Sequence, residues 1–162
     1  MPEYRDGGRL CCWIVRMMEL RTSVYIPHPP EVVWAVLTAG EDWHRWNAAQ
    51  PGLRGTITEG GSGRIALRLV RWMLWVPIIF HQVSACQSLF WRGGVGPLFY
   101  AVHGFELRAD GTGTQVMHTE RFTGMIPALL GGLMGRVLRP MYRATNAGLL
   151  ARSAVLADES AP

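Results

Sequence analysis

The chain has 162 residues, of which 49% are hydrophobic and 17% are charged. This length and composition predict a single globular domain with a sizeable buried core. The net charge is +4, but all sixteen basic residues are arginines scattered from Arg5 to Arg152. The sequence therefore lacks the basic stripe that is typical of nucleic-acid-binding proteins, and we expect no nucleic-acid partner.

Residues 1–17 come before the first convincing element and predict an N-terminal tail or an extra edge strand. The domain itself is expected at residues 18–157. Two cysteines, Cys11 and Cys12, are adjacent in the first segment, and the third is Cys86. An odd number of cysteines without CxxC spacing favours buried thiols in a reducing cytoplasm over a disulfide framework or a zinc site.

The first predicted elements are one strand and two short helices. Residues 20–26 are rich in β-branched and aromatic side chains and precede a proline, which predicts a strand. The stretch PPEVVWAVL, residues 29–37, predicts a helix that opens at a proline and ends near Gly40. A second short helix follows, with Trp43 and Trp46 one turn apart.

An alternating pattern then replaces the helical one. Residues 64–70 alternate between apolar and other side chains, and strand-like runs follow at residues 78–85, 88–92, 98–108 and 113–122. Short turns between consecutive strands predict an antiparallel meander. The uncharged run 72–91 is interrupted by Pro77 and by polar residues, so we expect no transmembrane segment.

From Met125 onward, apolar residues recur every three or four positions and predict a long C-terminal helix. Pro140 lies inside this pattern and is expected to kink or split the helix. Several glycines weaken it as an isolated helix, so it needs a surface to pack against. We therefore predict an α+β fold in which a curved antiparallel sheet of six or seven strands grips the final helix, with the two short helices at one end.

Five segments carry a resemblance to a known superfamily: PPEVVWAVLTAGEDWHRWNA, GTITEGGSGRIALRL, HGFEL, GTQVMHTERFTG and NAGLLARSA. In this order the chain resembles the START-related, birch-pollen-allergen-like helix-grip superfamily (SRPBCC), and in particular its bacterial polyketide cyclase/dehydrase-like members. The resemblance implies a deep cavity between sheet and helix, which relatives use for lipids, sterols, polyketides or other hydrophobic molecules. It transfers no catalytic residue, because the members share a scaffold and not a reaction.

The sequence departs from the family pattern in two places. The stretch VRWMLWVP stands where the family usually has a polar turn, and Pro140 with the preceding arginine interrupts the last helix. Both departures are expected near cavity entrances. Trp72, Trp75 and the two residues between them either extend a strand that buries them or form an exposed apolar patch for a transient membrane-surface or protein contact.

The most informative pair of strands is joined at residues 110–111, an Asp-Gly hairpin signal. Centring a two-residue turn there pairs His103 with His118 and Ala101 with Glu120. Side chains alternate along a strand, so all four point to one face, which is otherwise apolar. The buried polar groups on this inner face must have partners.

Three roles remain open for His103, His118 and Glu120. They can hydrogen-bond to one another for structure alone, anchor the polar part of a ligand in an apolar cavity, or form an acid/base pair or metal site. Neither a further ligand nor HxH or HxxE spacing supports a metal, so we expect no metal and no cofactor. Any catalysis is expected to use one of these residues, since no nucleophile elbow is present.

The predicted cavity wall combines inner-face strand positions with the apolar stripe of the last helix. The short-helix tryptophans either pack in the core or cover the cavity as a lid. The predicted ligand-binding residues are Trp34, Trp46, Phe80, Trp91, Phe99, His103, Phe105, His118, Glu120, Phe122, Leu130, Met134, Val137 and Met141.

Three functions are consistent with these features. The first is binding or transport of a hydrophobic small molecule such as a lipid, a polyketide or a sterol-like ligand. The second is a cofactor-independent cyclase, aromatase or dehydratase that uses the cavity histidines and glutamate as acid and base. The third is a protein-interaction module. The sequence leaves open whether the protein is an enzyme and whether it is a monomer or a homodimer, and we expect it in the cytoplasm.

Overall fold

The computed structural model describes residues 17–69 and 71–159. In chain order its elements are β1 (Met18–Ile26), α1 (Pro30–Thr38), the 3-10 helix η1 (Gly40–Arg45), β2 (Gly52–Gly55), β3 (Ser62–Leu69), β4 (Trp72–Ser84), β5 (Ser88–Val95), β6 (Phe99–Asp110), β7 (Gly113–Thr123) and α2 (Met125–Glu159). The predicted N-terminal tail or edge strand lies outside the described residues, apart from Met17.

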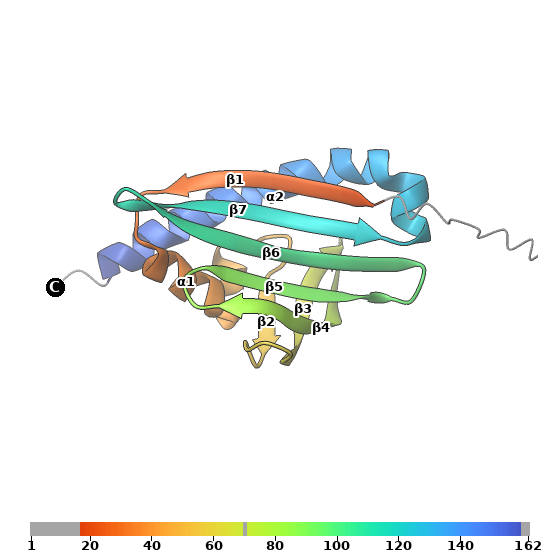
Figure 1. Cartoon of the computed structure of the whole chain (residues 1–162), viewed down its shortest axis with the longest axis horizontal. Helices are drawn as coiled ribbons and strands as arrows, with labels where there is room; N and C mark the ends of the chain where they lie inside the picture. Colours follow the sequence, from red (N-terminus) through yellow and green to blue (C-terminus); the bar gives the residue numbers. More distant parts are fainter. Residues whose placement is uncertain (1–16, 70, 160–162) are drawn as a thin grey trace, which may run out of the picture.

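The strands form one antiparallel sheet in the order β1-β7-β6-β5-β4-β3-β2. The first strand pairs with the last one, and the two helices α1 and α2 lie on the same side of the sheet (Figure 1). The predicted helix-grip architecture, including the two short helices after the first strand, is confirmed. The four-residue edge strand β2 is an element that the sequence pattern did not predict.

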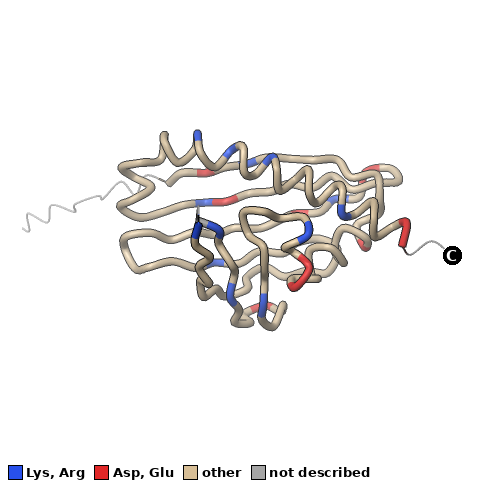
Figure 2. Tube along the Cα trace, turned by 180° about the vertical axis from the view of Figure 1, so that it is seen from behind, with Lys and Arg blue, Asp and Glu red and all other residues tan. Residues whose placement is uncertain are grey.

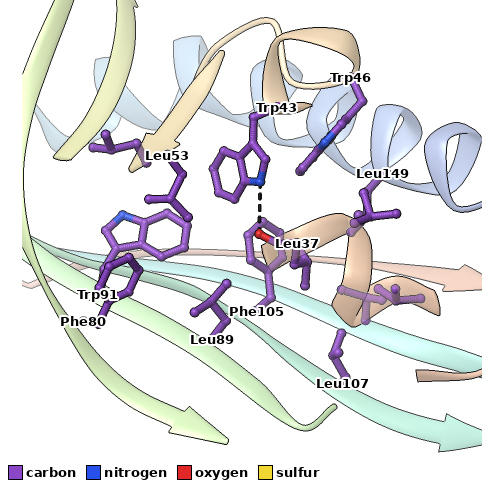
Figure 3. Close-up of a cluster of buried hydrophobic side chains, with 14 of the residues drawn as sticks. Leu37, Trp43, Trp46, Leu53, Phe80, Leu89, Trp91, Phe105, Leu107 and Leu149 are labelled. Atoms are coloured by element: carbon purple, nitrogen blue, oxygen red, sulfur yellow. Dashed lines mark hydrogen bonds between the residues drawn. The ribbon is translucent and has the colours of Figure 1, made fainter. Parts of the chain in front are cut away.

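The short helices α1 and η1 are held by the core beneath them. Pro30 occupies the first turn of α1, where its missing amide proton costs nothing. Trp43 of η1 is completely buried, and its indole N–H donates to the carbonyl oxygen of Leu37 at 3.0 Å (Figure 3). The ring of Trp43 also contacts those of Trp46 and Trp91, with centroids 5.2 and 5.7 Å away. These contacts tie the helical pair to the concave face of the sheet.

The hairpin of β3 and β4 contains the first departure from the family pattern. The strand β4 begins at Trp72, six residues earlier than predicted, because Trp72 pairs with Leu69. This extension does not bury the segment: Trp72 and Met73 are exposed. Only Trp75 is half-buried, and the guanidinium carbon of Arg54 lies 4.8 Å from its ring centroid. Each of the two predicted alternatives, a strand extension and an exposed apolar patch, is thus correct in part, because β4 is longer than predicted and its end carries exposed apolar side chains.

The long helix α2 continues through Pro140, so the proline does not split it. One face of α2 packs toward the sheet through residues such as Met134 and Met141. Another apolar face, which includes Leu129 and Leu133, is exposed. No helix among the described residues is long and apolar enough to cross a membrane.

Candidate functional site

The strands β6 and β7 bring three ionisable side chains to the inner face of the sheet. The hairpin turn lies at residues 111–112, so His103 pairs with Glu120, and Phe105 pairs with His118. The first turn residue is a glycine with a φ of +59°, which glycine adopts without strain. The predicted pairing of His103 with His118 is wrong by two residues. A shift of two keeps each side chain on its predicted face, because side chains alternate with a period of two.

A series of hydrogen bonds connects the loop before β2 with α2 and β1 across the inner face of the sheet. Gln50 Nε2 lies 3.2 Å from His103 Nδ1, and His103 Nε2 lies 2.6 Å from His118 Nε2. On the other side of its ring, His118 Nδ1 lies 2.9 Å from Asn146 Oδ1. The Asn146 amide donates through Nδ2 to the hydroxyl oxygen of Thr22 at 3.0 Å.

The direction of this chain follows from the acceptor at its α2 end. A carbonyl oxygen can only accept, so the contact with Asn146 places a proton on Nδ1 of His118. The other ring nitrogen of neutral His118 is then an acceptor, and His103 donates to it through Nε2. His103 Nδ1 in turn accepts from the amide of Gln50. The network is thus complete with both imidazoles neutral.

Burial keeps this cluster uncharged near neutral pH. His103 and His118 are 3% and 1% exposed. Desolvation lowers the pKa of His118 to about 4, against a smaller opposing effect of the hydrogen bond with Asn146. Desolvation and repulsion from His118 lower the pKa of His103 well below its usual value. Burial raises the pKa of Glu120 to about 8. The 3.7 Å approach of Glu120 Oε1 to His103 Nδ1 is therefore a contact of neutral groups and not an ion pair.

Tyr142 of α2 stacks on the two imidazoles. Its ring centroid lies 4.4 Å from that of His118 and 5.7 Å from that of His103, with nearly parallel planes. The Tyr142 hydroxyl is buried and has no hydrogen-bond partner within the part of the chain that the structure describes. An unpartnered buried hydroxyl costs about 1–3 kcal/mol.

A cavity of about 430 Å³ opens between the sheet and α2. Its polar lining residues are Gln50, His103, His118, Glu120, Tyr142 and Thr145, together with the exposed Arg68 of β3. Most of the remaining wall is apolar and includes Ile65, Ile78, Trp91, Phe122 and Leu138. A largely apolar cavity with a few convergent polar groups is typical of sites for small hydrophobic molecules.

The geometry of the histidine pair does not suit a metal. A zinc–nitrogen bond is about 2.0–2.1 Å long, so two Nε2 atoms only 2.6 Å apart leave no room for an ion between them. The described residues contain no group of three or more His, Cys, Asp or Glu side chains placed to hold a metal ion. The two histidines are instead joined by a hydrogen bond.

Comparison with known protein families gives a match over residues 17–154 to the family described as polyketide cyclase/dehydrase and lipid transport. The match covers most of the chain. The chain belongs to this family. The resemblance that the sequence motifs carried is thereby confirmed.

Several solved structures have the same fold as this protein. A protein of unknown function from Staphylococcus aureus has a TM-score of 0.73 at 12% identity, over 90% of this chain and 98% of that one. The Zhui aromatase/cyclase from Streptomyces sp. R1128 has a TM-score of 0.69 at 13% identity, over 85% and 94%. Ara h 8.0201 has a TM-score of 0.59 at 11% identity, over 83% and 99%. These identities show the fold alone, and no curated protein matches the sequence.

The predicted ligand-binding residues divide into three groups in this family member. Those that line the cavity are Trp91, Phe99, His103, His118, Glu120, Phe122, Met134 and Met141. Those that lie in or against the core between sheet and short helices are Trp34, Trp46, Phe80 and Phe105. The last two, Leu130 and Val137, are exposed on α2. The tryptophans of the short helices thus pack in the core and form no part of the cavity wall.

Sequence reasoning missed four side chains of the polar cluster, namely Gln50, Tyr142, Thr145 and Asn146. The helical stripe contained a signal for two of them, because Thr145 and Asn146 are polar residues on the buried face of a helix. A buried polar residue of this kind needs a partner. No local pattern indicated Gln50, which lies in the loop before β2.

Proposed function

We propose that this protein binds an uncharged hydrophobic molecule with at least one polar oxygen, held in the cavity between the sheet and α2. One observation carries the proposal: the cavity of about 430 Å³ has a mostly apolar wall and one buried cluster of neutral polar groups, and the arginine in its lining, Arg68, is exposed. The family description, which includes lipid transport, supports the same class of ligand. A lipid, a polyketide or a sterol-like molecule fits this description.

The polar cluster favours a ligand that accepts hydrogen bonds. Glu120 is protonated near neutral pH, because its pKa is raised to about 8, and its carboxyl group is then a donor. A carbonyl or ether oxygen next to Glu120 would accept this hydrogen bond. A purely aliphatic ligand would leave the carboxyl donor unpaired, at a cost of about 1–3 kcal/mol.

A matched pair of substitutions on β6 tests the cavity. Ala101 lines the cavity, whereas Ala109 lies on the same face of the same strand and is exposed. Ala101→Phe places a ring inside the cavity and is expected to weaken binding of the uncharged dye Nile red at least tenfold, which corresponds to a loss of about 1.4 kcal/mol of binding free energy. Ala109→Phe is the control and should bind like the wild type. Equal affinity of all three proteins in a fluorescence titration would contradict cavity binding.

A second candidate function, acid–base catalysis, is favoured by the contact between Glu120 and His103. A protonated carboxyl group and a neutral imidazole nitrogen 3.7 Å apart can act as acid and base in one water-poor cavity. In a dehydration, His103 would exchange the Gln50 amide at Nδ1 for the substrate and accept the proton from a carbon next to a carbonyl group, while Glu120 protonates the leaving hydroxyl. A carbon–carbon double bond forms and water leaves. A protein with the same fold, the Zhui aromatase/cyclase, is an enzyme by its name, which supports a catalytic role for this fold.

The enzyme hypothesis is tested by separating turnover from binding. With a β-hydroxyketone as substrate, Glu120→Gln is expected to reduce turnover at least about a hundredfold, the usual contribution of a general acid. The same variant should still bind Nile red, because glutamine has almost the same shape and can donate a hydrogen bond. Turnover that is unchanged in Glu120→Gln would remove this second function and leave binding alone.

A further inference from the structure

The opening of the cavity is bordered by exposed apolar side chains from three segments of the chain. We call this surface the mouth patch and define it by Trp72, Val95, Leu129, Leu133 and Val137. Trp72 and Leu129 are 80% and 81% exposed, which is unusual for large apolar groups. Val95 lines the cavity, and Trp72 lies on the same face of β4 as Leu74, which lines the cavity two residues further on. On α2, Leu129, Leu133 and Val137 follow one another at four-residue steps, and Val137 lies one turn from Met134 and Met141 of the cavity wall. The patch therefore adjoins the cavity wall.

The segments that contribute the mouth patch carry charge of one sign. The segments 62–76, 92–100 and 124–157, which contribute the patch, contain arginines but neither aspartate nor glutamate. Arg71 and Arg136 are exposed, and neither forms an ion pair with any of the described residues. Figure 2 shows basic positions both on the β3–β4 hairpin and on α2. Any partner that covers this face must therefore accept a positive rim around an apolar centre.

We propose that the mouth patch docks on a bilayer surface that contains anionic lipids, and that the hydrophobic ligand passes between bilayer and cavity there. The proposal rests on the cavity binding proposed above. Exposed tryptophan and leucine can enter the boundary between headgroups and acyl chains, while arginines contact the phosphates. A second copy of the chain fits this face less well, because its own arginines would approach the same positive rim.

Vesicle sedimentation tests the docking. The wild type should bind vesicles of equimolar phosphatidylcholine and phosphatidylglycerol, and much less those of phosphatidylcholine alone. The double variant Arg71→Gln/Arg136→Gln should bind the anionic vesicles roughly twenty-five-fold more weakly, at about fivefold for each arginine. Trp72→Ser/Leu129→Ser should lose at least about tenfold. Val155→Ser, an exposed apolar position near the other end of α2, and Arg108→Gln on β6 are the controls and should bind like the wild type.

The outcomes separate docking from cavity binding. None of the four variants alters a side chain that lines the cavity, so each should bind Nile red in solution like the wild type. Unchanged vesicle binding in both patch variants would overturn the docking proposal while leaving the cavity function intact. A dimer in sedimentation velocity that Trp72→Ser converts to a monomer would also overturn it, since a second copy would then cover the patch. Absence of Nile red binding by the wild type would instead overturn the proposed function.

Discussion

The neutral state of Glu120 predicts how stability changes with pH. The pKa of this carboxyl group is raised from 4.5 to about 8 by burial. Between these values the folded protein binds a proton that the unfolded chain releases, so the free energy of unfolding must fall as the pH rises through this window. At 1.36 kcal/mol per pH unit, the full window corresponds to about 5 kcal/mol, an upper limit for this group.

The histidines have the opposite sign, and their effect is small above pH 6.5. The pKa of His118 is lowered from 6.5 to about 4, so its effect is a loss of stability as the pH falls through and below 6.5. The pKa of His103 is lowered in the same direction. Above pH 6.5 both imidazoles are neutral in the folded protein, and in the unfolded chain their remaining protonation is lost by pH 8. From pH 6.5 to pH 8 the loss caused by Glu120 is expected to be about 2 kcal/mol, of which the two histidines offset less than about 1 kcal/mol.

Urea denaturation followed by tryptophan fluorescence measures this loss. The free energy of unfolding is determined at pH 6.5 and at pH 8 for the wild type, for Glu120→Gln and for Glu106→Gln. Glu120→Gln keeps the shape of the side chain and removes its titration, so its stability should not fall over this interval and should rise slightly, because the unfolded histidines lose their protons. Glu106 is a half-buried glutamate of β6 outside the cavity, and its variant should keep the wild-type loss. The same loss in Glu120→Gln as in the wild type would refute the assignment of a protonated carboxyl group.

Three further predictions concern α2. Gly148→Ala should lower the free energy of unfolding by more than about 2 kcal/mol, because a Cβ atom there would lie 2.1 Å from the carbonyl oxygen of Trp46. Gly132→Ala should instead stabilise by up to about 1 kcal/mol, because its Cβ atom meets open space and alanine is the better helix former; calorimetry that ranks these two variants the other way would contradict the packing. Asn146→Asp should raise the pKa of His118 above about 4 by offering a carboxylate to Nδ1, and an unchanged nitrogen-15 titration of the imidazole would contradict the hydrogen-bond chain.

The sequence was sufficient for the fold because its periodic signals are long. The strands β5 to β7 and the helix α2 were each predicted within a few residues at their ends. The register between β6 and β7 was not, because an Asp-Gly pair does not say whether its glycine is the first or the second residue of the turn. The glycine is the first, at position 111. The residues of the inner face were still predicted correctly, because a register shift of two residues leaves every side chain on the same face.

The candidate site was predictable only where local alternation determines direction. His103, His118 and Glu120 could be placed on one face because they belong to strands. The position of Tyr142 depends on how α2 is rotated against the sheet, and tertiary packing decides that rotation. The same uncertainty explains Val137, which continues the apolar stripe of α2 but is exposed. An apolar stripe shows that a helix has a face to cover, but it does not show what covers it.

The distribution of charge separates two tasks in this molecule. The buried polar groups of the cavity are neutral near pH 7, because the imidazoles have lost their protons and the carboxyl group of Glu120 has kept its own. An anionic ligand group next to this buried cluster would find no charge to balance its desolvation, so the deep part of the cavity favours uncharged groups. The arginines Arg68, Arg71 and Arg136 are exposed at the surface. A molecule can thus be selected for neutrality inside, while attraction to an anionic surface acts only on the outside of the protein.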